Sequence, residues 1–123
     1  MQIIATNKIL LSSWHHVVNM ALVLNDAQTV VDIIPLVKST VEQSFVIFYS
    51  GVITAPVDAL RTMLVAKPGN QYMLKEMKQK FCLCDFELPM LSVGYSGELW
   101  LWQDIDANTL IPSNLTTVKI INS

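Results

Sequence analysis

Charged side chains are scarce in this sequence. Only 15% of its 123 residues are Asp, Glu, Lys or Arg, whereas a typical soluble domain has about 25%. Arg61 is the single arginine, and the formal net charge is −2. Proteins that bind nucleic acid usually present a patch rich in arginine and lysine, and the one lysine cluster here, over 75–80, contains Glu76. The composition therefore argues against nucleic acid as a partner.

Cysteine is also rare, since Cys82 and Cys84 are the only two. A single residue separates them, so a bond between them could not link distant parts of the chain. We interpret both as free thiols in a reducing compartment. Structural zinc sites usually have about two to four residues between paired cysteines. The adjacent His15 and His16 point apart in either a helix or a strand. We therefore expect no bound metal and no cofactor.

No familiar catalytic motif occurs in the chain. The G-x-S-x-G pattern of serine hydrolases and the glycine-rich loops that bind phosphate groups are both missing. Asp104 and Asp106 have the spacing of calcium ligands, but the glycine and the terminal glutamate of an EF-hand loop are missing. We predict no catalytic residue, and the sequence favours a protein that is not an enzyme.

Apolar runs long enough to cross a membrane are missing as well. The longest uncharged stretches are Ile9–Asn25 and Gln43–Val57, and neither has the roughly 18–20 continuous apolar residues of a spanning helix. The N-terminus has no basic residue before its first apolar stretch, which argues against a signal peptide. We expect a protein of the cytoplasm, or of an assembled particle, with no membrane span.

Apolar side chains, by contrast, are abundant. They make up 52% of the chain, and the mean hydropathy is +0.44. The length suits a single domain, 1–123. We predict an α+β fold, with helices mainly in the first two-thirds and a largely antiparallel sheet completed by C-terminal strands.

The spacing of the apolar residues predicts individual elements. Helices are expected over 27–43, Thr54–Ala66 and 71–80. In the second of these helices Thr54 suits the N-cap, and the buried stripe includes Leu60, Met63 and Leu64. Segment 14–24 fits either a helix or a strand. Strands are expected over 2–6, 9–11, 44–51, 81–88 and 115–121, and a hairpin is expected from 90–93 and 98–102.

Two closely spaced tryptophans are the most specific feature of the sequence. In a strand, Trp100 and Trp102 share one face, and Leu99 and Leu101 share the other. We expect the leucines to face the core. Because aromatic residues are enriched at protein interfaces, we expect Trp100 and Trp102, together with Tyr95, at or near a contact with another molecule. The alternative is that a helix of the same chain covers the indole rings.

Low charge, high apolar content and the tryptophan pair together suggest how the protein functions. The leading hypothesis is a non-enzymatic protein that associates with itself or with a protein partner, such as a structural subunit of a virus or phage particle. One alternative is a small acidic neutralising protein of the antitoxin or immunity type. Another is an enzyme whose site has no familiar motif.

Overall fold

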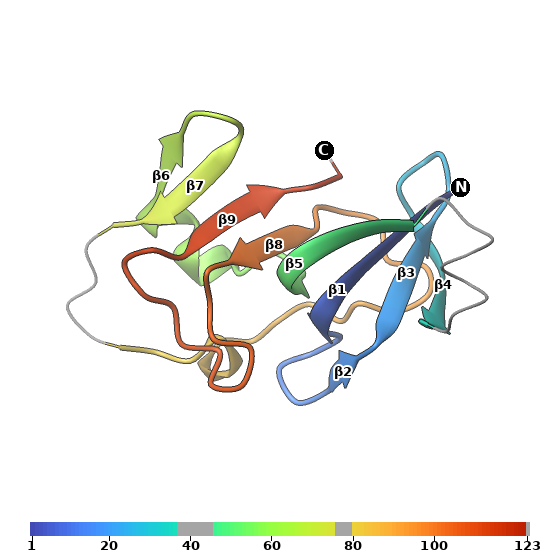
Figure 1. Cartoon of the computed structure of the whole chain (residues 1–123), viewed down its shortest axis with the longest axis horizontal. Helices are drawn as coiled ribbons and strands as arrows, with labels where there is room; N and C mark the ends of the chain where they lie inside the picture. The colour runs from blue at the N-terminus through green and yellow to red at the C-terminus, as the bar shows by residue number, and fades with distance from the viewer. Residues whose placement is uncertain (37–45, 76–79, 123) are drawn as a thin grey trace.

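The part of the chain that the structure describes folds around one mixed β-sheet of nine strands (Figure 1). The computed structural model describes residues 1–36, 46–75 and 80–122. Within these ranges the helical elements are two short 3-10 helices, η1 (Asp58–Met63) and η2 (Leu83–Asp85). The strands are β1 (Gln2–Leu10), β2 (His16–Val18), β3 (Met20–Leu24), β4 (Val30–Pro35), β5 (Val46–Thr54), β6 (Leu64–Lys67), β7 (Gln71–Leu74), β8 (Trp100–Gln103) and β9 (Thr117–Ile120).

Strand β5 joins two groups of strands into a single sheet, whose order is β4-β3-β1-β5-β8-β9-β7-β6, with β2 paired to β1. Strand β5 pairs parallel with β1 from Val46 to Ile53, and its last residues, Val52–Thr54, also pair antiparallel with β8 on the other side. Figure 1 shows β1, β3 and β4 at one end of the molecule and β6, β7 and β9 at the other. The other strand pairings are antiparallel.

The predicted α+β fold with helices in the first two-thirds is wrong, because this part of the chain is built mainly from strands. Segment 14–24 forms β2 and β3, as its strand alternative predicted. The helix over 27–43 is wrong where the structure describes it, since Val30–Pro35 is strand β4, and residues 37–43 lie outside the described ranges. Pro35 ends an edge strand, where its missing N–H breaks no inner ladder.

The predicted helix Thr54–Ala66 is replaced by three different structures. Thr54 ends β5, Asp58–Met63 forms η1, and Leu64 begins β6. Thr54 does not cap a helix, because its hydroxyl donates to the carbonyl oxygen of Ala55. The expected burial of Leu60 is confirmed at 1% exposure, whereas Met63 and Leu64 are half-buried.

Three further predictions over 71–103 are wrong. Gln71–Leu74 is strand β7 rather than the start of a helix, and residues 76–79 are outside the described ranges. Segment 81–88 contains η2 instead of a strand. The hairpin of 90–93 with 98–102 does not form, because β8 pairs with β5 and β9.

Other predicted strands are confirmed. Those expected over 2–6, 9–11 and 115–121 are found in β1 and β9, and the strand expected over 44–51 is found from residue 46 onward.

Both faces of β8 are buried inside the chain. Leu99 and Leu101 pack into one apolar cluster, while Trp100 and Trp102 pack into a second cluster on the opposite face. All four side chains are fully buried. The first cluster also contains Ile4, Ile9, Leu22, Leu24, Val30, Ile53, Ala55 and Leu91. The second also contains Leu10, Val52, Val57, Leu60, Leu83, Leu88, Leu110 and Val118.

Candidate functional site

The structure places the predicted contact residues Trp100 and Trp102 in the core. Both are 0% exposed, their ring centroids lie 6.0 Å apart, and the indole N–H of Trp102 donates to the Thr54 hydroxyl at 2.9 Å. The alternative was that a helix of the same chain covers the indole rings, and residues of the 3-10 helices η1 and η2 do pack with them, together with irregular segments. A contact made directly by these rings would therefore require this core to open.

Tyr95, the third predicted contact residue, is half-buried and packs against the first cluster. Its hydroxyl donates to the carbonyl oxygen of Glu98 at 2.7 Å. Burial raises the pKa of the phenol, and the nearby carboxylates of Glu98 and Asp58 raise it further. Tyr95 is therefore a neutral hydrogen-bond donor that holds the 95–98 turn.

An ion cluster formed by Arg61, Asp58 and Glu98 lies against Trp100. The Arg61 guanidinium lies over the Trp100 ring, 5.2 Å from its centroid. It also donates to Asp58 at 2.7 Å and to Glu98 at 2.8 Å. These two hydrogen bonds raise the pKa of Arg61. Because the single arginine is engaged by two carboxylates and a ring, we assign it a packing role.

The interpretation of Cys82 and Cys84 as free thiols is wrong, because they are bonded to each other as a disulfide. The turn of η2 brings their Cα atoms to 5.2 Å, within the range that a disulfide spans. The part of the chain that the structure describes contains no group of three or more His, Cys, Asp or Glu residues placed to hold a metal ion. That the protein binds no metal remains a prediction.

A mostly apolar pocket of about 240 Å³ lies between the β1–β2 loop, strand β4 and the segment after η2. Met90 and Val93 stand at its mouth, 66% and 63% exposed, whereas Leu91 is buried at its base. The pocket is lined by Leu11, Ser12, His15, Ile33, Met90, Leu91, Ser92 and Val93. We call these residues the apolar pocket surface.

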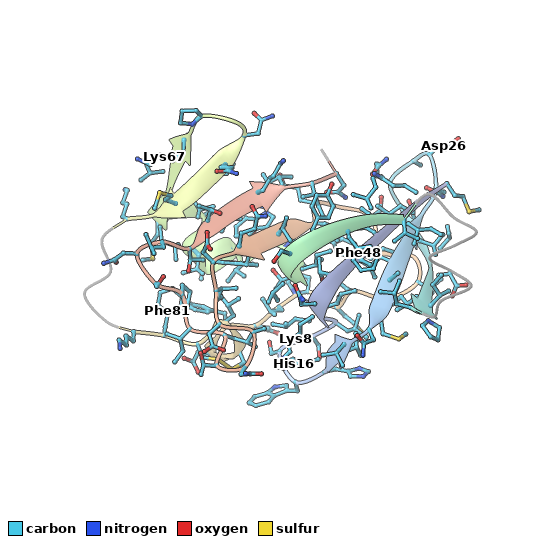
Figure 2. The ribbon with its side chains drawn as sticks, viewed as in Figure 1. Lys8, His16, Asp26, Phe48, Lys67 and Phe81 are labelled. Atoms are coloured by element: carbon cyan, nitrogen blue, oxygen red, sulfur yellow. A yellow bond between two sulfur atoms is a disulfide. The ribbon has the colours of Figure 1, made fainter. Side chains whose placement is uncertain are left out.

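Trp14 lies in the same loop that forms one wall of this surface. It is 89% exposed. The loop is held by hydrogen bonds from the N–H of Leu11 to the His15 carbonyl and from the N–H of His15 to the Ser12 hydroxyl. His16, which follows the loop, is labelled near the lower edge of Figure 2. Sequence reasoning did not identify Trp14 as an exposed tryptophan, although its polar neighbours, Ser12, Ser13, His15 and His16, were a signal of exposure.

The contrast among the three tryptophans predicts a fluorescence result. Iodide quenches only indoles that it can reach, and Trp14 alone of the three is exposed. We expect Trp14→Phe to abolish most of the iodide-quenchable emission, while Trp100→Phe leaves that component in place. Stern–Volmer titrations of the two variants measure this directly. Undiminished quenching in Trp14→Phe would mean that a core tryptophan is accessible.

The chain matches no protein-family model, no curated protein and no solved structure. Within the described residues, no helix is long and apolar enough to cross a membrane.

Proposed function

We propose that this chain is a non-enzymatic protein that associates, with itself or with a protein partner, through the apolar pocket surface and the neighbouring Trp14. The observation that carries the proposal is an open pocket with mostly apolar walls, one of which is formed by a loop that also carries a highly exposed tryptophan. Contiguous exposed apolar surface marks association sites. Tryptophan and methionine are also enriched in interfaces.

Hydrogen bonds between the walls support a preformed binding surface. The N–H of Leu91 donates to the Leu11 carbonyl at 2.8 Å. The Ser13 hydroxyl donates to the Phe86 carbonyl at 2.6 Å and accepts from the Leu88 N–H at 3.2 Å. Because these bonds tie the β1–β2 loop to the segment after η2, little conformational entropy is lost when a partner binds.

The chemistry of the pocket lining favours association over catalysis. Its polar side chains are Ser12, His15 and Ser92, and its other lining residues are apolar. The charged groups Arg61, Asp58 and Glu98 are engaged with one another at a separate place. Such a lining suits an apolar side chain of a partner, for which exclusion of water supplies the binding free energy.

Replacement of Trp14 and Met90 by serine tests this proposal. We expect the wild-type chain to sediment above its monomer mass of 13.8 kDa as concentration rises, and Trp14→Ser/Met90→Ser to shift that transition to at least about tenfold higher concentration, which is about 1.4 kcal/mol. Analytical ultracentrifugation over a concentration series measures both.

Leu115→Ser is the matched control, because Leu115 is 73% exposed and does not line the pocket. It should associate as the wild type does, and circular dichroism should show that all variants keep the strand signal. A wild-type chain that stays monomeric at every concentration would contradict self-association. Equal association by the double variant and the wild type would contradict the assigned surface.

A further inference from the structure

The two cysteines form a disulfide across a single residue, close to the surface. Cys82 and Cys84 are both half-buried, and Cys82 packs against the second apolar cluster from its outer side, so neither residue is enclosed in the core. Phe81, labelled toward the left of Figure 2, immediately precedes them. This location gives a small reagent a route to the bond.

The bond contributes little to holding the fold together. A disulfide stabilises a protein mainly by closing a loop in the unfolded chain, and the effect grows with the length of that loop. Here the sequence separation is 2, so the two sulfurs remain neighbours even in the unfolded chain. Because folding brings the two sulfur atoms little closer together, it does little to stabilise the disulfide against reduction.

Polar groups around Cys82 suit both the bonded and the reduced state. The N–H of Cys84 donates to the Sγ atom of Cys82 at 3.4 Å. The carbonyl oxygen of Thr109 lies 3.3 Å from the same sulfur. A reduced Cys82 can therefore donate its S–H to Thr109 while it still accepts from Cys84, without a rearrangement of the backbone.

We propose that Cys82 and Cys84 form a reversible dithiol–disulfide site, which exchanges with low-molecular-weight thiols of the glutathione class while the chain stays folded. The thiolate of one thiol molecule bonds to one cysteine sulfur, and the protein S–S bond breaks with its electron pair on the other sulfur. A second thiolate then attacks the sulfur of the bound thiol, and the mixed disulfide breaks with its electron pair on the cysteine sulfur, which takes up a proton. Two thiols are oxidised to one disulfide, and the protein gains two electrons and two protons.

The residue between the cysteines keeps the segment in place during this exchange. Leu83 is fully buried in the second apolar cluster. Its N–H donates to the carbonyl oxygen of Leu110 at 2.9 Å. Because neither interaction involves a sulfur atom, η2 stays docked when the bond opens, and reduction remains a local event.

A glutathione titration of the native protein tests the proposal. The protein is equilibrated at a series of ratios of reduced to oxidised glutathione, quenched with acid and alkylated, and the thiols are counted by mass spectrometry. We expect the disulfide fraction to fall smoothly and to return on reoxidation, and the ratio of dithiol to disulfide to rise with the square of the reduced glutathione concentration at a fixed concentration of oxidised glutathione. Circular dichroism should stay constant throughout. A disulfide that persists until urea unfolds the chain, or thiols that never pair in oxidised glutathione, would overturn the proposal.

Cys82→Ser supplies a second, independent measurement. Without the Cys82 thiol, no second cysteine of the chain can attack the mixed disulfide between glutathione and Cys84 and release the glutathione. We expect this variant to accumulate one glutathione adduct in oxidised glutathione, where the wild type accumulates little. A folded Cys82→Ser variant that takes up no adduct would show that Cys84 is inaccessible and would contradict the site. The titration of the wild-type chain decides the matter on its own if the variant does not fold.

Discussion

Replacement of Trp102 by alanine is expected to lower the free energy of unfolding by about 3–5 kcal/mol, the range for large aromatic residues removed from a core. Trp102 is 0% exposed. It packs beside Trp100 and donates its indole N–H to the buried Thr54 hydroxyl. The variant therefore loses apolar contacts, opens a cavity and removes a buried hydrogen bond. Urea unfolding followed by circular dichroism measures the difference.

Trp14→Ala is the matched control, since it removes the same side chain from a position that is 89% exposed. We expect a change within about 0.5 kcal/mol, as is usual for surface substitutions. Similar losses in the two variants would mean that Trp102 does not belong to a closely packed core. The comparison thus separates packing of the indole from any general effect of deleting a tryptophan.

Gly51→Ala is expected to destabilise the chain by at least about 3 kcal/mol, because strained backbone and steric overlap act together. Gly51 has a φ of +138°, which side-chain-bearing residues rarely adopt. A β-carbon there would overlap the carbonyl oxygen of Trp102, on the strand next to β5. Relief of the overlap requires β5 and β8 to separate where the two groups of strands join.

Gly69→Ala distinguishes the overlap from the backbone strain. Gly69 has a φ of +83°, but a β-carbon at that position would meet no atom within 4 Å. We expect a loss of about 1–2 kcal/mol, the cost of a left-handed conformation alone. Equal losses for the two alanine variants in urea titrations would show that β5 and β8 do not approach closely at Gly51.

Strands with an unambiguous local pattern could be predicted from sequence. The run Val46–Tyr49 is apolar and β-branched or aromatic, and Gly51 follows it, so a buried strand was predicted there. The strand is confirmed, but its expected burial is wrong, because Ile47 and Phe48 are 37% and 55% exposed. The alternation over 115–121 likewise predicted β9. Both segments form strands in the folded chain, because their local preference for strand agrees with their pairing in the sheet.

Helices were predicted wrongly where two periodicities fitted the same residues. Val30, Ile33 and Ile34 lie at helical spacing, but they are β-branched and pair with β3 in the sheet. Thr54 and Pro56 resemble a helix start, yet the Thr54 hydroxyl is needed by Trp102. In each case, a partner distant in sequence decided between local alternatives of similar energy.

The sequence by itself determined that the residues of 99–102 alternate leucine and tryptophan on opposite faces of a strand, because side chains in a strand point alternately to its two sides. It also determined the low charge and the high apolar content. Only the tertiary structure decided that both faces are buried in one chain, since η1, η2 and the segments around Leu88 and Leu110 fold over the tryptophans. It also decided that Trp14 is the exposed indole. Which side chains meet water depends on contacts between distant segments, which local spacing does not encode.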